Sequence, residues 1–125
     1  MEWRFNNTVS IPVQSTHVYG ELEIPLQAQS VVIFSHGSGS SRLSPRNQQV
    51  ARYLHQQQFG TLLFDLLTEK EDIHFQNRFD IELLTKRLVS VTGWLEKQPV
   101  TLGMSLGYFG ASTGAASAIR AAAIL

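Results

Sequence analysis

Short, uninterrupted apolar runs recur along the chain and alternate with segments whose apolar residues are spaced three or four apart. The run Val31-Val32-Ile33-Phe34 contains three β-branched residues, and Thr61 to Phe64 and Leu106 to Phe109 are runs of the same length. Runs of this kind are typical of strands that are buried on both faces of a parallel sheet. The pattern therefore predicts three central strands.

A helix is predicted between the first two of these runs. Ser44-Pro45 is expected to start it, with Ser44 as the N-cap and the proline at the first helical position. Gly60 is expected to close it, because glycine is the commonest residue just past a helix end. Its one-sided apolar face comprises Val50, Ala51, Tyr53 and Leu54.

A second helix is predicted from the spacing of apolar residues after Asp80, which we expect to cap it. Gly93 weakens this helix slightly, and Pro99 marks its end. The apolar positions follow alternating steps of three and four, as one face of a helix requires: Ile81, Leu84, Leu88, Val91 and Leu95.

The N-terminal quarter has the pattern of a β-hairpin. Thr8 to Val13 and His17 to Ile24 combine β-branched and aromatic residues in partial alternation, with a short polar connection between them. Pro12 and Pro25 favour the margin of a sheet, because proline cannot donate a hydrogen bond to a neighbouring strand. Leu66 to Phe79 has no clear period and predicts a long excursion between regular elements.

The order of these elements is strand, helix, strand, helix, strand, helix, which is typical of a parallel sheet with crossover helices. The predicted fold class is α/β, a three-layer α/β/α arrangement whose mostly parallel sheet carries an antiparallel N-terminal pair. Residues 1–125 are expected to form one domain. Ala121 to Leu125 has the character of a helix interior with no cap, so this domain is expected to be incomplete at its C-terminus.

Composition narrows the range of partners. The chain is 43% hydrophobic and 16% charged, as in ordinary globular domains, and its ten basic and ten acidic residues cancel. We therefore expect no nucleic-acid partner and no anionic membrane surface. No apolar run approaches a membrane span, and no cysteine is present, so we expect a cytoplasmic protein that binds a small molecule. No pair of histidines has metal-ligand spacing, so neither a metal nor a cofactor is expected.

The candidate chemistry centres on Gly110-Ala111-Ser112-Thr113-Gly114, which follows one predicted strand and precedes a run of small, helix-compatible residues. A tight strand-to-helix turn can hold a serine in a strained conformation with its hydroxyl exposed. This requires residues without side chains two before and two after the serine, since strand and helix nearly touch there. The alternative is a glycine-rich connection that only packs tightly.

A second polar loop, His36-Gly37-Ser38-Gly39-Ser40-Ser41, follows Phe34 and Ser35. Both loops lie at carboxyl ends of predicted neighbouring strands, where open α/β sheets bind ligands. The run from Ser35 to Asn47, together with Asp65-Leu66-Leu67-Thr68, Arg78-Phe79-Asp80-Ile81 and the serine turn, resembles the dienelactone-hydrolase-like branch of the α/β-hydrolase superfamily.

This resemblance implies that Ser112 is the nucleophile of a hydrolase acting on ester or lactone substrates. It also implies an oxyanion hole formed by the backbone N–H of Thr113 and an N–H near Ser38 or Gly39, with Gly110 and Gly114 shaping the turn. Dienelactone hydrolases proper use a cysteine nucleophile, so the serine is a departure from that branch.

A larger departure concerns the rest of the triad. In this superfamily the acid and the histidine follow the serine, whereas the thirteen residues after Ser112 contain no histidine. We therefore expect the chain to be a nucleophile-bearing half that hydrolyses simple esters very poorly. The alternative is a non-catalytic interaction module or a fragment that assembles with a partner chain.

The remaining candidates have competing interpretations. His36 is the histidine nearest to the serine strand. The resemblance implies a role for it in loop structure and not as the base that activates Ser112, and His36 could also contact the substrate. His17, His55 and His74 are expected to have surface or structural roles. Arg42 and Arg46 flank the predicted site and could hold an anionic substrate group, or pair with a neighbouring carboxylate. A dinucleotide-binding loop is disfavoured, because Arg42 stands where the third glycine would be.

Three geometric expectations follow. Ser112 should have an unusual backbone conformation, and the amides of Ser38 and Gly39 should lie near its hydroxyl. The strand from Leu106 to Phe109 should be an exposed edge, with unpaired backbone groups and apolar side chains beside them. We therefore expect self-association as a homo-oligomer, or binding of a complementary fragment.

Overall fold

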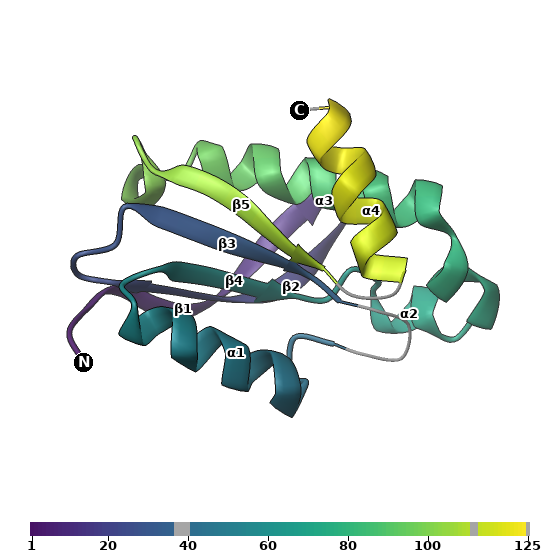
Figure 1. The fold of residues 1–125 in the computed structure, drawn as a ribbon. Coiled ribbons are helices and arrows are strands. Elements are labelled where there is room, and N and C mark those ends of the chain that lie inside the picture. The colour runs from purple at the N-terminus through teal and green to yellow at the C-terminus, as the bar shows by residue number, and fades with distance from the viewer. Residues whose placement is uncertain (37–40, 111–112, 125) are drawn as a thin grey trace.

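The structure, a computed structural model, describes residues 1–36, 41–110 and 113–124. A central sheet is covered by helix α1 on one face and by α3 and α4 on the other (Figure 1). In chain order the strands and α-helices are β1 (Trp3–Val13), β2 (Thr16–Pro25), β3 (Ser30–Ser35), α1 (Pro45–Gln56), β4 (Gly60–Phe64), α2 (Glu69–Asp72), α3 (Ile81–Glu96), β5 (Ser105–Gly110) and α4 (Thr113–Ile124). Two short 3-10 helices, Phe75–Phe79 and Pro99–Thr101, lie between α2 and α3 and between α3 and β5.

The sheet has the strand order β1-β2-β4-β3-β5. Strands β4, β3 and β5 run parallel, whereas β2 pairs antiparallel with β4 and β1 antiparallel with β2. All five residues of β4 are buried, as expected for a central strand that is covered on both faces. The three-layer α/β fold predicted from the sequence is thereby confirmed. The parallel register pairs Ser35 with Gly110, so β3 and β5 end side by side.

The core is divided between the two faces of the sheet. The larger cluster lies under α3 and α4 and includes Ile33, Leu62 and Leu88. The smaller cluster lies under α1 and consists of Phe34, Ala51 and Leu63, with partly buried Phe109 packed against it. The rings of Phe34 and Phe109 are stacked with centroids 5.0 Å apart. Helix α3 presents the predicted face, with Leu84, Leu88, Val91 and Leu95 all buried.

Helix α1 begins as predicted but ends differently. Pro45 occupies its first turn, while the Ser44 side chain makes no capping hydrogen bond. The helix ends at Gln56, and Gln58 adopts a left-handed φ of 63°. Gly60, predicted to close this helix, lies in β4, where a Cβ would come within 3.2 Å of Val31. Gly60 therefore lies in a closely packed part of the sheet and does not cap the helix.

Tyr53 was also predicted to lie on the buried face of α1, and this is wrong, because its side chain is 62% exposed. At 100° per residue, Tyr53 lies 200° from the buried Ala51. The buried polar position on this helix is His55, whose Nε2 lies 2.8 Å from the hydroxyl of Thr61 in β4. Burial lowers the pKa of His55, with a smaller contribution from Arg52, so the neutral imidazole is favoured.

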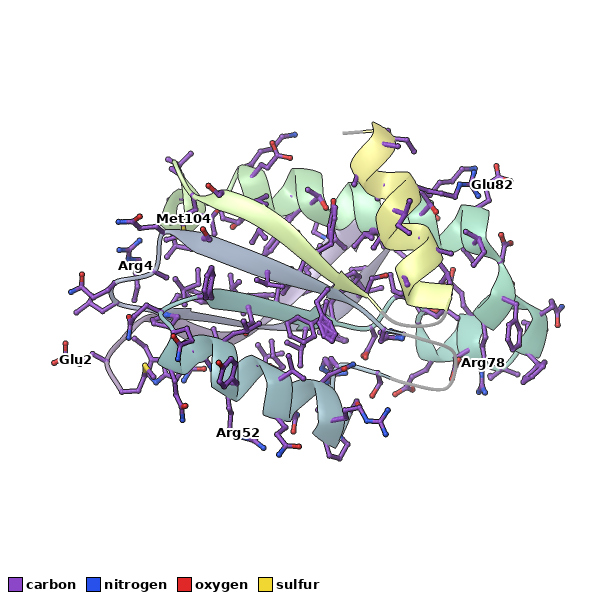
Figure 2. All side chains as sticks on the ribbon, viewed as in Figure 1. Glu2, Arg4, Arg52, Arg78, Glu82 and Met104 are labelled. Carbon is purple, nitrogen blue, oxygen red and sulfur yellow. The ribbon has the colours of Figure 1, made fainter. Side chains whose placement is uncertain are left out.

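The predicted excursion between β4 and α3 contains regular structure. Thr68 and Glu71 form a capping box at the start of α2, in which the Thr68 hydroxyl accepts the Glu71 N–H and the Glu71 carboxylate accepts the Thr68 N–H. The Asp80 carboxylate accepts the Leu83 N–H and caps α3, as predicted. Glu82 on α3 and Arg52 on α1 extend away from the sheet on opposite sides (Figure 2).

Strand β5 forms one edge of the sheet among the described residues, as predicted. Helix α4 contacts β5, and its Ile119 and Ile124 are 72% and 65% exposed. The predicted self-association through this edge stays a prediction. Within the described part of the chain, no helix has both the length and the apolar character needed to cross a membrane.

Candidate functional site

The ends of β3 and β5 and the start of α4 meet with no space for side chains at two glycines. A Cβ on Gly110 would lie 2.8 Å from the Gly114 carbonyl oxygen and 2.9 Å from the Ala115 Cα. A Cβ on Gly114 would lie 2.6 Å from the carbonyl carbon of Ser35, and closer still to the carbonyl oxygens of Ser35 and His36. Real Cβ atoms do not approach backbone so closely, so neither position has space for a side chain.

Some of the predicted site residues lie outside the part of the chain that the structure describes. They are Ser112, Ser38 and Gly39. Thr113 is the first residue of α4, so its backbone N–H belongs to the helix N-terminus, where the macrodipole favours negative charge. The separation of Ser112 from the amides of Ser38 and Gly39 stays a prediction.

A buried pair of hydroxyls ties the first turn of α4 to β3. The Oγ atoms of Ser35 and Ser117 lie 3.0 Å apart, and Ser117 Oγ also donates to the Gly114 carbonyl at 3.0 Å. Both serines are almost completely buried, so their polar groups are satisfied within the protein. Neither serine was predicted from the sequence as a site residue. Ser117 was recognisable only as a polar residue in an otherwise alanine-rich helix.

His36 is held by the segment that follows β4. Its Nε2 accepts a hydrogen bond from the Leu66 backbone N–H at 2.9 Å. Acceptance at Nε2 places the ring proton on Nδ1. Since the Nε2 lone pair is engaged, this nitrogen does not serve as the base for a neighbouring serine. The contact supports the structural role favoured for His36.

Arg42 is paired with Asp65, which follows β4. Its Nη1 lies 2.5 Å from Asp65 Oδ2, and its backbone N–H donates to Asp65 Oδ1 at 2.8 Å. Glu21 Oε1 lies 3.6 Å from Arg42 Nε, and the guanidinium carbon lies 5.9 Å from the centre of the Tyr19 ring. Of the two interpretations for Arg42, the structure favours pairing with a carboxylate. Arg46 is exposed on α1 and does not line the cavity described below.

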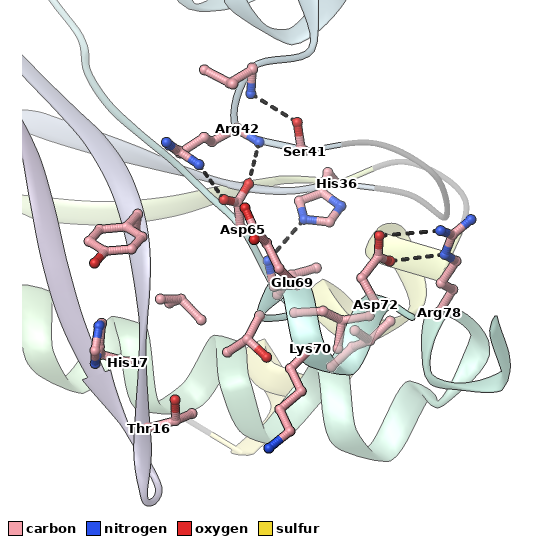
Figure 3. Close-up of a pocket in the computed structure, with 17 residues that line it drawn as sticks. Thr16, His17, His36, Ser41, Arg42, Asp65, Glu69, Lys70, Asp72 and Arg78 are labelled. Carbon is pink, nitrogen blue, oxygen red and sulfur yellow. Dashed lines mark hydrogen bonds and ion pairs between the residues drawn. The ribbon is translucent and has the colours of Figure 1, made fainter. Parts of the chain in front are cut away.

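A cavity of about 670 Å³ opens beside His36 and Arg42. Its walls come from the start of β2, the segment after β4, helix α2 and the first turns of α3 (Figure 3). The apolar part of the wall includes Val18, Tyr19, Leu66, Leu67 and Leu84. His36, which lines the cavity, has its carbonyl close to Gly114 at the start of α4.

An ion pair between Arg87 and Glu71 lies beside the cavity, and Arg87 also contacts Leu66 in the cavity wall. The guanidinium of Arg87, which is 4% exposed, donates to both carboxylate oxygens of Glu71, one of them at 2.7 Å. It also donates to Gln14 Oε1 at 2.8 Å and to the Leu66 carbonyl at 3.3 Å. The hydrogen bond from Arg87 is the main cause that lowers the pKa of the Glu71 carboxyl. Arg87 thereby joins the hairpin turn, the segment after β4, α2 and α3.

The described residues contain no group of histidine and carboxylate side chains that could hold a metal ion.

Comparison with curated proteins gives two Mycobacterium tuberculosis proteins, both provisionally named phosphoribosyl transferases. Each is 56% identical over 106 residues, which is 85% of this chain and 24% of the relative. The chain thus spans about a quarter of the length of the curated relatives it matches. No protein-family model matches the chain.

Comparison with solved structures gives a dienelactone hydrolase from Anabaena variabilis that is 47% identical. The match covers 99% of this chain and 59% of that protein, with a TM-score of 0.93. The structure named Est1E from Butyrivibrio proteoclasticus is 17% identical, with a TM-score of 0.77 over 94% of this chain and 45% of that one. The second similarity concerns the fold alone. The chain thus has the α/β-hydrolase fold, and the resemblance to its dienelactone-hydrolase-like branch is confirmed.

Proposed function

We propose that the chain carries the nucleophile of a serine hydrolase that acts on ester-like substrates, with Ser112 as the attacking residue. The observation that carries this proposal is the closure of backbone around Gly110 and Gly114, which leaves no space for a Cβ at either position. A connection selected only for tight packing needs no serine between two such glycines. An elbow that presents a nucleophile needs all three residues in this order.

The proposed reaction begins when the Ser112 hydroxyl oxygen attacks the substrate carbonyl carbon. The carbonyl π electrons move to oxygen, and the resulting oxyanion accepts hydrogen bonds from the Thr113 N–H and from an amide near Ser38 or Gly39. Each such donor contributes about 3 kcal/mol to lowering the barrier. The N-terminus of α4 adds a favourable field for the negative charge.

A base must accept the hydroxyl proton of Ser112. The Nε2 atom of His36 accepts the Leu66 N–H, and the buried His55 on α1 is hydrogen-bonded to Thr61 in β4. His17 and His74 are exposed side chains. We therefore propose that the base is supplied by residues outside this sequence, in keeping with the 59% of the dienelactone hydrolase that the chain spans.

The name of the mycobacterial relatives is not carried over to this chain. The matched segment is a quarter of those proteins, and their name refers to the whole molecules. The proposal of acyl transfer to water is supported by the close approach of backbone at Gly110 and Gly114 and by the similarity to the dienelactone hydrolase.

The proposal is tested first on the chain itself with 4-nitrophenyl acetate. Without a base, turnover is limited to the residual contribution of binding and the oxyanion donors, and Ser112→Ala should change it by less than about threefold. Rapid hydrolysis that depends on Ser112 would show that a base lies within residues 1–125.

A chimera separates the nucleophile from the missing base. Residues 1–125 would replace the segment of the Anabaena dienelactone hydrolase that they match, and the parent hydrolase would serve as the positive control. We expect ester hydrolysis that falls by at least about 10³-fold in Ser112→Ala. A folded chimera whose hydrolysis is unaffected by Ser112→Ala would overturn the proposal and favour a non-catalytic module.

A further inference from the structure

The cavity beside His36 has walls that suit an uncharged ligand. The apolar part of its lining includes the exposed side chains of Tyr19 and Leu43, together with Leu67. Its volume of about 670 Å³ lies within the range of small-molecule sites. Pockets of this kind obtain most of their affinity from apolar contact and their specificity from a few polar groups.

The charged residues around the cavity cancel one another. They are three carboxylates and three cations. Two of the cations are already engaged, because Arg42 binds Asp65, and Arg78 binds both oxygens of Asp72 at 2.9 and 3.2 Å. The third cation, Lys70, is exposed and adjoins Glu69 in α2. The cavity therefore offers little net attraction for an anion.

Arg42 is the cation best placed to receive a carboxylate, yet its pairing opposes this role. Its side chain is 24% exposed and that of Asp65 is 23% exposed, so the pair is largely removed from water. An anion that displaced Asp65 would leave that carboxylate partly buried without its partner, which is unfavourable. Glu21, 3.6 Å from Arg42 Nε, adds further negative charge on the same side.

We propose that this cavity binds the uncharged, apolar group of a neutral ester, and that Asp65 sets this preference by neutralising Arg42. This inference rests on the proposed function for the identity of the ligand as an ester, and it adds the substrate class. It assigns Tyr19 as an apolar wall of the site and Asp65 as the residue that excludes substrates with a carboxylate.

The test measures binding, so it does not depend on turnover. Acetanilide is a hydrolysis-resistant isostere of a neutral phenyl ester, and 4-acetamidobenzoate has the same shape with an added carboxylate. Each is titrated into the ¹⁵N-labelled chain while the backbone amides of the cavity wall are followed by NMR. We expect acetanilide to shift the amides of Tyr19, Leu66 and Leu67, with a dissociation constant at least tenfold lower than that of 4-acetamidobenzoate.

Two variants and a control test whether the ligands bind at Tyr19 and whether Asp65 disfavours the carboxylate probe. Tyr19→Ala should weaken acetanilide binding at least threefold, whereas Tyr53→Ala, which removes an exposed tyrosine of α1, should leave it unchanged. Asp65→Asn should strengthen binding of 4-acetamidobenzoate at least fivefold, because Arg42 loses its closest carboxylate. Retained dispersion of the amide spectrum verifies that each variant is folded.

Three outcomes would overturn the inference: no shift of the cavity amides by acetanilide, equal or tighter binding of the carboxylate probe, or no gain for that probe in Asp65→Asn. Both probes resist hydrolysis, so the titration does not require an activated Ser112. The binding test therefore decides only which ligands the cavity prefers, and the chimera decides only whether Ser112 is the nucleophile. A negative result in one experiment does not change the conclusion from the other.

Discussion

Replacing Gly114 by alanine is expected to destabilise the chain by at least about 3 kcal/mol, a large part of the stability of a typical domain. The added Cβ would lie 2.6 Å from the Ser35 carbonyl carbon and closer to two carbonyl oxygens. All three atoms that the Cβ would approach are backbone atoms of Ser35 and His36, so the collision cannot be relieved by rotating a side chain. Relief requires α4 to move from the sheet, which would break the contact between Ser35 and Ser117.

Urea unfolding followed by circular dichroism measures this effect. Gly93→Ala is the matched control, because Gly93 lies within α3 with nothing within 4 Å of an added Cβ. That substitution should stabilise the chain by up to about 1 kcal/mol, since alanine has the higher helix propensity. Equal unfolding midpoints for Gly114→Ala and the unsubstituted chain would contradict the tight approach at this turn.

Glu71→Gln is expected to destabilise the chain by about 3 kcal/mol at neutral pH. The substitution removes the carboxylate that neutralises Arg87, while the Arg87 guanidinium is 4% exposed and cannot reach water without moving α3. Glutamine keeps the shape of the side chain, so the loss of stability measures the effect of removing the negative charge. Glu82→Gln is the control, because Glu82 forms an exposed pair with Lys86 that contributes about 0.5 kcal/mol or less.

The loss of folding stability caused by Glu71→Gln should also depend on pH. Because Arg87 holds the pKa of Glu71 below its usual value of 4.5, the folded state binds a proton on this group less readily than the unfolded state. The stabilisation by Glu71 is therefore complete above the unfolded pKa and is lost as pH falls through the folded pKa. The difference between Glu71→Gln and the unsubstituted chain should shrink below about pH 4. A difference that stays constant down to pH 3 would contradict this.

The regular elements could be predicted because their signals are local. The run from Val31 to Phe34 and the spacing from Leu84 to Leu95 depend only on the strand and helix periods, and both appear in the structure. Gly110 could be predicted because the atoms that exclude a Cβ there belong to Gly114 and Ala115, a few residues along the chain. For each of these, the neighbouring residues determine the outcome. The need for glycine at Gly114 also involves Ser35 and His36, which lie far from it in the sequence.

The remaining features depend on contacts between distant segments. Gly60 resembles a helix stop, but its role is set by Val31 and Ile24, which pack against it from neighbouring strands. The hydrogen bond from Leu66 to His36 joins residues 30 apart, and that from Arg87 to Gln14 joins residues 73 apart. No sequence pattern marks such pairs. The cavity that these contacts shape could therefore be found only from the three-dimensional structure.

The backbone conformation of Ser112, determined in a crystal structure of the chain, tests the central claim most directly. The account predicts dihedral angles outside the helical and extended regions, with the hydroxyl directed toward the edge where β3 and β5 end. Ordinary helical or extended angles at Ser112 would contradict it, because the residue would then lie in a simple connection and would not present a nucleophile.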